Sequence, residues 1–206
     1  IDKKYFIRPH IYDTCLKHLM RDRIIFLTGA PGVGKTITST MLLLECASQG
    51  YKVKYTTNAN LTDIKRSLSV DRNAKEVILL DDCLGQHYFK MNENKESELL
   101  SLIKYVQMNS KKKLIMNSRI AIFNEARGRS IEFNKFFNRE TILNYLIDMD
   151  NVSSIDKAKI LYSHLYFNGI PSPHFKELRQ DKRYKNIVKH KNYTPRIIEF
   201  ISEPHV

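Results

Sequence analysis

Residues 29–36 have the composition and spacing of a loop that binds phosphate groups. The segment fits the pattern G-x-x-x-x-G-K-[ST], in which glycines let the backbone turn tightly enough for successive N–H groups to point at a phosphate. In this pattern the lysine reaches the β- and γ-phosphate oxygens, so Lys35 is also a candidate catalytic residue, and the Thr36 hydroxyl is a candidate Mg²⁺ ligand. The predicted nucleotide site comprises Gly29, Ala30, Pro31, Gly32, Val33, Gly34, Lys35, Thr36 and Ile37.

The residues on both sides of this loop predict the strand and the helix that such a loop connects. The run Ile24–Thr28 is short, apolar and β-branched, as expected of a buried parallel strand. The segment Lys35–Ser48 has apolar residues at helical spacing and no internal Gly or Pro, and Gly50 ends it. The positive end of that helix then faces the phosphates.

Two adjacent acids follow another apolar run, which is typical of the Walker B motif. The run Val77–Leu80 predicts a buried strand, and its end should meet the phosphate loop at the same edge of the sheet. Asp81 is the candidate ligand of Mg²⁺, usually through water. Asp82 is the candidate base that orients and deprotonates the attacking water, and the alternative for it is a helix cap or turn residue.

Polar residues also follow a third strand, which is predicted at Lys113–Met116. Asn117 or Ser118 can hydrogen-bond the γ-phosphate or the attacking water, and Arg119 can pair with a phosphate through two hydrogen bonds. This is where P-loop ATPases with an additional strand carry sensor 1. We therefore predict a nucleotide contact for Asn117 and a catalytic role for Arg119, whose alternative is a surface position at a helix start.

The N-terminal segment offers residues for the adenine pocket. It is predicted to be extended, because Pro9 disfavours helix at the residue before it, and it lies just upstream of the phosphate loop. In nucleotide-binding proteins of this architecture the leading segment commonly packs on the base. Phe6, Ile7 and Arg8 are the candidates, and the alternative is simple packing of an N-terminal arm.

The remaining patterns predict an α/β P-loop core at residues 1–152 and an all-helical lid at residues 153–206. Strand patterns disappear after Ser153, where apolar residues recur only at helical spacing. Core strands are predicted at Lys52–Thr56 and Thr141–Ile147, and core helices at Ile11–Met20, Leu61–Leu68, Glu96–Met108 and Ile120–Ala126, the last ended by Gly128. Lid helices are predicted from Ser153 or Ser154 to Phe167 and at Phe175–Leu178, Arg183–His190 and Pro195–Ser202.

The last of these helices begins with a signature that fixes its first turn. Thr194 is the predicted cap and Pro195 occupies the first helical position, so the side chain of Arg196 extends from a rigid point. We expect Arg196 to reach the phosphates when lid and core are closed, and Pro195 to pack on the base or sugar. The alternative for Arg196 is an arginine on the lid surface.

Net charge and composition limit which partners and which cellular location the sequence predicts. The formal charge of +12 permits a nucleic-acid partner, but the basic residues are spread along the chain, and Lys111–Lys113 is predicted to be a solvated turn. Apolar runs are too short to span a membrane, and no signal peptide is recognisable. The three cysteines suit reduced thiols, which predicts a cytoplasmic location. Because the first residue is Ile, we expect the chain to be a piece of a longer protein.

Taken together, the motifs resemble the third of the "novel STAND" NTPase families, which are signal-transducing ATPases related to AAA+ proteins. The resemblance implies a five-stranded parallel sheet of the additional-strand type, with the sensor 1 strand between the Walker A and Walker B strands, and a helical lid. Family members more often have Thr where this chain has Asn117, and an aromatic residue where it has Cys83. The segments that carry the resemblance are 79–86, 117–119, 124–126, 160–167 and 190–199.

This resemblance implies a switch that binds ATP or ADP with Mg²⁺ and hydrolyses ATP slowly. Members are bacterial multidomain proteins, many of them antiphage sensors, in which the ATPase lies between an effector domain and a repeat sensor and gates oligomerisation. The alternative function is a nucleic-acid-acting ATPase of the AAA+ type, favoured by the net charge. A small-molecule kinase is a third hypothesis, but its lid would carry more arginines in well-placed motifs.

Overall fold

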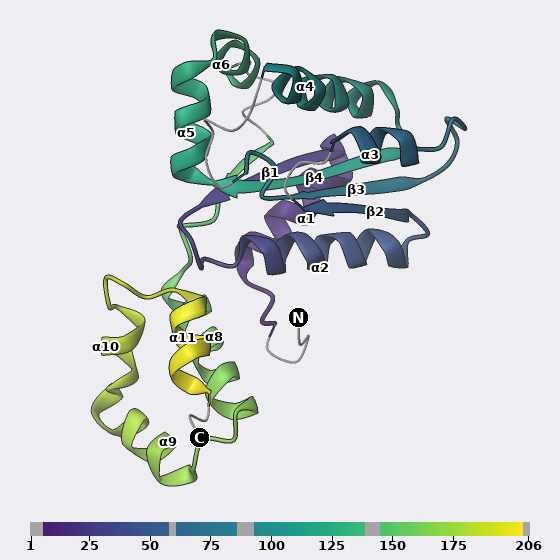
Figure 1. Ribbon diagram of the computed structural model, residues 1–206. Helices are drawn as coiled ribbons and strands as arrows, with labels where there is room; N and C mark the ends of the chain where they lie inside the picture. The colour runs from purple at the N-terminus through teal and green to yellow at the C-terminus, as the bar shows by residue number, and fades with distance from the viewer. Residues whose placement is uncertain (1–5, 58–60, 86–92, 139–144, 204–206) are drawn as a thin grey trace.

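The fold is built on an all-parallel sheet that the sequence predicts in its main features. The computed structural model describes residues 6–57, 61–85, 93–138 and 145–203. Its five strands lie in the order β2-β3-β4-β1-β5 (Figure 1). Strand β4, which carries Asn117, therefore lies between the strands of the Walker A and Walker B motifs, as predicted. The strands are β1 (Ile24–Gly29), β2 (Lys52–Thr57), β3 (Glu76–Asp81), β4 (Lys112–Arg119) and β5 (Leu146–Asp148).

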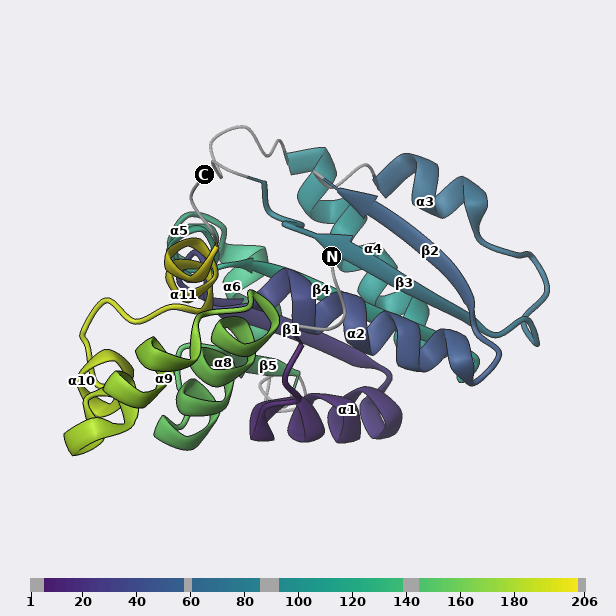
Figure 2. The ribbon, with the colours of Figure 1, turned by 90° about the horizontal axis from the view of Figure 1, so that it is seen from below.

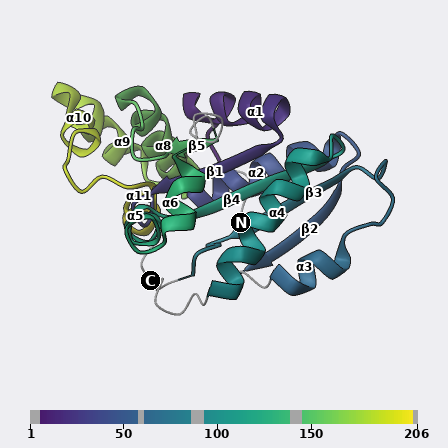
Figure 3. The same ribbon diagram turned by 90° about the horizontal axis from the view of Figure 1, so that it is seen from above.

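Helices cover both faces of this sheet (Figures 1 and 3). One face packs on α1 (His10–Asp22) and α2 (Lys35–Ser48). The other face packs on α3 (Leu61–Ser67), α4 (Glu93–Met108), α5 (Ile120–Arg129) and α6 (Ile131–Phe137). Because each central strand is buried on both sides, its sequence is a continuous apolar run, and all residues of β1 are buried.

Two local predictions about this core are corrected by the structure. Gly128 does not end a helix, since α5 continues to Arg129. The side chain of Ser130 then accepts a hydrogen bond from the Phe133 amide and caps α6, a helix that the sequence patterns did not reveal. The capping serine, rather than the glycine, separates the two helices because it supplies an acceptor for a free amide. Strand β5 begins at Leu146, and residues 141–144 of the predicted strand lie outside the described residues.

The C-terminal residues form helices with a small apolar cluster of their own, made by Leu161, Val188, Tyr193 and Ile198. Figure 2 shows these helices grouped at one end of the sheet, beside the start of α2. The His10 amide of α1 donates to Asp156 Oδ2 at 3.2 Å, which joins the two parts. In the described part of the chain, no helix is long and apolar enough to cross a membrane. The helices are α8 (Ser154–Phe167), α9 (Ser172–Arg179), α10 (Tyr184–Val188) and α11 (Pro195–Ser202).

The prediction of a solvated turn at Lys111–Lys113 is wrong for two of the three lysines. Lys112 is 0% exposed and Lys113 is 4% exposed, because both belong to β4 inside the sheet. Their ammonium groups have buried partners: Lys112 Nζ lies 2.6 Å from Glu76 Oε2 of β3, and Lys113 Nζ donates to the Leu19 carbonyl oxygen at 3.0 Å. Burial of a charge is tolerated where such partners replace water.

The buried Lys112–Glu76 pair predicts a large effect on stability. Lys112→Ala removes the closer cationic partner of the Glu76 carboxylate, which is 1% exposed, and leaves only Lys54 Nζ, 3.9 Å from Glu76 Oε1. We therefore expect a loss of about 3 kcal/mol in unfolding free energy. Urea unfolding followed by circular dichroism measures it. The exposed neighbour Lys111→Ala is the control and should change stability by less than about 0.5 kcal/mol. Equal effects of the two substitutions would contradict the assignment.

Candidate nucleotide-binding site

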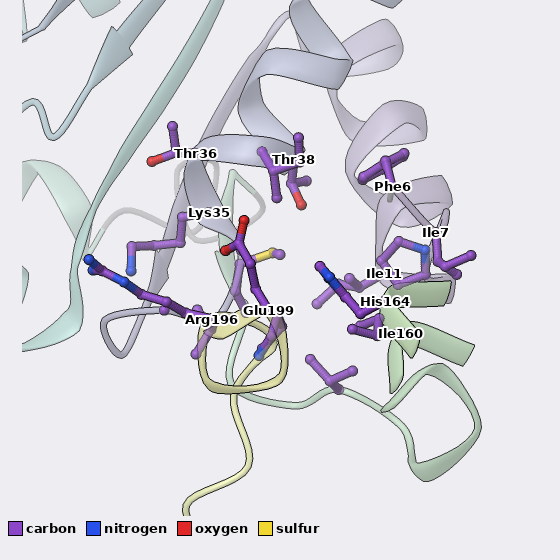
Figure 4. A pocket seen from close by; sticks show the side chains of 18 of the residues that line it. Phe6, Ile7, Ile11, Lys35, Thr36, Thr38, Ile160, His164, Arg196 and Glu199 are labelled. Atoms are coloured by element: carbon purple, nitrogen blue, oxygen red, sulfur yellow. The ribbon is translucent and has the colours of Figure 1, made fainter. Parts of the chain in front are cut away.

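A cavity of about 620 Å³ opens where the phosphate loop, the N-terminal segment and the C-terminal helices meet (Figure 4). Its volume is in the range of small-molecule sites. The phosphate loop and the first turn of α2 form one wall, and Phe6 and Ile7 form part of another. Helices α8 and α11 close the remaining side through Ile160, His164, Pro195, Arg196 and Glu199. All predicted loop residues from Gly32 to Ile37 line the cavity.

The backbone of the loop has the curled geometry that its glycines permit. Gly32 has φ +82° and Gly34 has φ +98°, values that side chains rarely allow. A Cβ atom on Gly32 would also lie 3.1 Å from Arg196 Cβ, so the loop and α11 approach each other closely at this glycine. The Arg196 amide donates to the Gly32 carbonyl oxygen at 3.3 Å. The start of α11 is therefore hydrogen-bonded directly to the phosphate loop.

Lys35 is held inside this loop. Its Nζ donates to the carbonyl oxygens of Gly29 at 2.9 Å and of Ala30 at 2.8 Å. Burial lowers the pKa of Lys35, while the carboxylates of Asp150 and Asp82 oppose that shift. The ammonium group is thus positioned by the same loop whose amides are expected to bind phosphate.

Asp150 is a residue of this site that the sequence analysis did not identify. Its Oδ1 accepts a hydrogen bond from the Ala30 amide at 2.7 Å. It follows β5, so it lies at the same sheet edge as the Walker B acids. That position, an acid two residues after the end of the last strand, was the available signal.

The Walker B strand brings Asp81 to the first residue of the loop helix. Thr36 Oγ1 donates to Asp81 Oδ1 at 3.1 Å, so the two predicted Mg²⁺ ligands face each other. Hydroxyl and carboxylate oxygens are the ligands that this cation prefers, and the pair therefore fits Mg²⁺. Among the described residues, no group of three or more His, Cys, Asp or Glu side chains forms a metal site made by the protein alone.

Asp82 lies in a turn directly after β3, with φ +51°, a conformation that Asp tolerates better than most residues. Burial raises the pKa of Asp82, and the charge of Arg119 acts in the opposite direction. Lys35 also lowers it. The two predicted catalytic cations, Lys35 and Arg119, are thus close enough to Asp82 to lower its pKa.

Asn117 connects the Walker B acids to α2 through its side-chain amide. Asn117 Nδ2 donates to Asp81 Oδ1 at 2.7 Å and to Ser39 Oγ at 2.9 Å, while its Oδ1 accepts from the Asp82 amide at 2.8 Å. The Asn117 amide therefore joins both Walker B acids to α2, and its predicted contact with a nucleotide stays a prediction. Ser118, the other candidate, is 0% exposed.

Only two of the three N-terminal candidates for the base pocket lie at the cavity. Phe6 and Ile7 line the cavity, but Arg8 does not. Arg8 Nε instead lies 2.7 Å from Asp13 Oδ1, and its guanidinium stacks 4.8 Å from the Tyr12 ring centroid. An acid and an aromatic face in the first turn of α1 therefore hold the Arg8 side chain away from the predicted base pocket.

The helix that carries Arg196 begins as predicted, with the Thr194 side chain accepting from the Ile197 amide and Pro195 in the first turn. Pro195 and Arg196 both line the cavity. Sequence reasoning assigned no site role to several other lining residues, although some belong to the two motifs at residues 160–167 and 190–199. These residues are Met149, Val152, Ile160, His164, Glu199 and Glu203.

A comparison with protein families identifies the family of this chain. A family model described as Novel STAND NTPase 3 matches residues 6–167. The chain belongs to this family. It is therefore a STAND-family P-loop NTPase domain, and the resemblance stated from its motifs is confirmed. No match was found among curated protein sequences.

Solved structures show that this STAND domain shares its fold with AAA+ ATPases. Domain III from the Thermotoga maritima replication initiation protein DnaA is 13% identical, with a TM-score of 0.59 over 93% of this chain and 78% of that one. AMPPCP-bound DnaA from Aquifex aeolicus is 17% identical, with a TM-score of 0.56 over 82% and 54%. The Thermotoga maritima RuvB Holliday junction branch migration motor is 14% identical, with a TM-score of 0.52 over 93% and 58%. The STAND chain thus spans little more than half the length of the last two, and the low identities establish the fold alone.

The role of Asn117 as a connecting residue predicts its effect on stability. Asn117→Ala leaves the Asp82 amide and the Ser39 hydroxyl without this partner, so we expect a loss of about 2 kcal/mol or more in unfolding free energy. The neighbouring Ser118→Ala is the matched control, because the Ser118 hydroxyl has no hydrogen-bond partner in the described part of the structure, and its removal should be nearly neutral. Denaturant unfolding compares them, and a neutral Asn117→Ala would contradict this role.

Proposed function

We propose that this domain binds ATP and ADP with Mg²⁺, hydrolyses ATP slowly, and uses the bound nucleotide to control the position of its C-terminal helices. The observation that carries the proposal is that one cavity is lined by both the phosphate loop and α11, which are hydrogen-bonded to each other through Gly32 and Arg196. A ligand in this cavity contacts both parts at once. Its presence and its phosphate number can therefore bias their arrangement.

Binding follows from the groups on the cavity wall. The loop amides and Lys35 bind the phosphates, while Phe6, Ile7 and Pro195 provide apolar contacts for the base. Thr36 and Asp81 would hold Mg²⁺, which neutralises phosphate charge when bound. Asn117 acts indirectly, because its side-chain amide holds Asp81 and Asp82 in position through hydrogen bonds.

Hydrolysis requires a water molecule to be oriented and deprotonated next to the γ-phosphate. Asp82 is the proposed base: it adjoins Asp81, and burial raises its pKa toward the range where a carboxylate accepts a proton more readily. Arg119 and Lys35 both lower the pKa of Asp82, which supports a position for these two cations near the proposed base. Cations at that position can stabilise the negative charge that develops on the phosphate oxygens. The proposal assigns them the stabilisation of that charge.

The switch divides the chain into a core at residues 1–152 and a lid at residues 153–206. The separate apolar cluster of the C-terminal helices supports this division. We place the domain in a cytoplasmic, multidomain bacterial antiphage protein, between an effector and a sensor domain, where nucleotide exchange gates homo-oligomerisation. Family membership supports this context, and the domains that flank this segment in the full protein would test it most directly.

Lys35→Ala tests the nucleotide site. Removal of the ammonium group from the loop should weaken ATP binding by about 100-fold, because charge-assisted hydrogen bonds to phosphate are lost. Isothermal titration of the purified protein with Mg·ATP measures the affinity, and circular dichroism checks the fold. Lys17→Ala, an exposed lysine of α1, is the control and should bind as the parent does. Equal affinities in all three proteins would rule out this site.

Arg196→Ala tests the coupling between nucleotide and lid. Because Arg196 lines the cavity from the first turn of α11, its loss should reduce the difference in protease protection of the C-terminal helices between ATP and ADP. Limited proteolysis with each nucleotide measures that difference. An unchanged difference would indicate that Pro195 or the N-terminal segment, not Arg196, couples the nucleotide to the lid.

The alternative function, an ATPase that acts on nucleic acid, is tested in the same preparations. The net charge of +12 favours this alternative, and strong stimulation of ATP hydrolysis by DNA or RNA would support it.

A further inference from the structure

Glu199 is a charged group of the cavity wall to which none of the functions above assigns a role. It lies three residues after Arg196 on α11, so both side chains project from the same face of the helix. In Figure 4 the Glu199 side chain points into the cavity, between Lys35 on one side and His164 on the other. The negative charge of Glu199 also acts on His164, which shows that the two side chains are near each other.

The carboxylate of Glu199 has no competing partner. Within residues 6–57, 61–85, 93–138 and 145–203, no hydrogen bond or ion pair of this carboxylate is found. Burial lowers the pKa of His164, which disfavours the cationic form of its ring, so His164 is a weak cationic partner for the Glu199 carboxylate. A carboxylate that faces a bound anion is unfavourable unless the ligand offers it a hydrogen-bond donor.

The chemistry of a nucleotide limits which of its groups can be that donor. Phosphate oxygens and the ring nitrogens of adenine only accept hydrogen bonds. The donors are the 2′- and 3′-hydroxyls of the ribose and the amino group of the base. The phosphate end of the cavity is fixed by Lys35 and Thr36, and its apolar base end by Phe6 and Ile7. Glu199 projects between these two ends, where the ribose joins phosphate to base.

We propose that Glu199 accepts hydrogen bonds from the ribose hydroxyls and makes this site specific for ribonucleotides over deoxyribonucleotides. This inference rests on the proposed nucleotide binding and adds the sugar to what the site recognises. Because Glu199 belongs to α11, the same hydrogen bonds also join the sugar to the C-terminal helices. Lid position then depends on an intact ribose as well as on the phosphates.

The test compares ligands that differ only in one donor. Affinities for ATP, 2′-deoxyATP and 3′-deoxyATP are measured by titration in the presence of Mg²⁺ for the parent protein, Glu199→Ala and Glu199→Gln. We expect the parent to bind ATP about tenfold more tightly than at least one deoxy analogue, as a hydrogen bond to a charged acceptor provides. Glu199→Ala should bind ATP and that analogue equally, and Glu199→Gln, which keeps an acceptor oxygen, should retain part of the difference.

Two controls separate this inference from its alternatives. Glu203→Ala, the other carboxylate on this wall, should keep the full preference of the parent. Purine riboside triphosphate, which lacks the amino group of adenine, should lose affinity equally in the parent and in Glu199→Ala. If the preference for the amino group disappears in Glu199→Ala instead, Glu199 reads the base and the ribose proposal is overturned.

The remaining outcomes are also decisive. A parent protein that binds ATP and both deoxy analogues with equal affinity overturns the ribose proposal but leaves nucleotide binding intact, as does an unchanged preference in Glu199→Ala. A parent that binds none of the ligands overturns the proposed function itself. Limited proteolysis gives a second readout: ATP should protect the C-terminal helices more than the deoxy analogue in the parent, and equally in Glu199→Ala.

Discussion

The hydrogen bonds of the Asn117 amide hold the site together. From β4 they reach Asp81 and Asp82 at the end of β3, and Ser39 in α2, so one side chain sets the positions of three elements. This is possible only because β4 lies between β3 and β1 in the sheet. If β3 and β1 were direct neighbours, the Walker B acids would meet the phosphate loop without this polar residue between them. The inserted strand therefore determines both the fold and the geometry of the predicted Mg²⁺ ligands.

The second constraint on this site is the balance of charge at the sheet edge. Lys35 is largely buried, and the carboxylates of Asp150 and Asp82 offset part of the cost that burial imposes on its ammonium group. Asp150 also accepts a hydrogen bond from the Ala30 amide. The same acid therefore stabilises the Lys35 charge and holds the loop backbone in place. A phosphate that enters the loop meets a cation already held in place, which lowers the cost of ordering it on binding.

The contact between the phosphate loop and α11 gives this arrangement its regulatory potential. Gly32 has no side chain to separate the two, and its carbonyl accepts from the Arg196 amide. The C-terminal helices have their own small apolar cluster, and α8 and α11 contribute side chains to the cavity wall. A ligand there replaces or strengthens contacts between the two parts, and this is the physical basis on which a nucleotide can shift lid position.

Local patterns in the sequence determined the phosphate loop, the Walker B acids, the helices of the C-terminal part and the cap of α11, because each depends on residues that are neighbours in the chain. The order of the strands was predicted from the family resemblance alone, because the sequence of a buried apolar strand does not specify which other strand it will pair with. Only the tertiary structure decided that Arg8 turns to Asp13, that Asn117 binds protein groups, and that Asp150 and Glu199 face the site. It also placed Lys112 inside the sheet, because the Glu76 carboxylate that balances its charge comes from a strand 36 residues away.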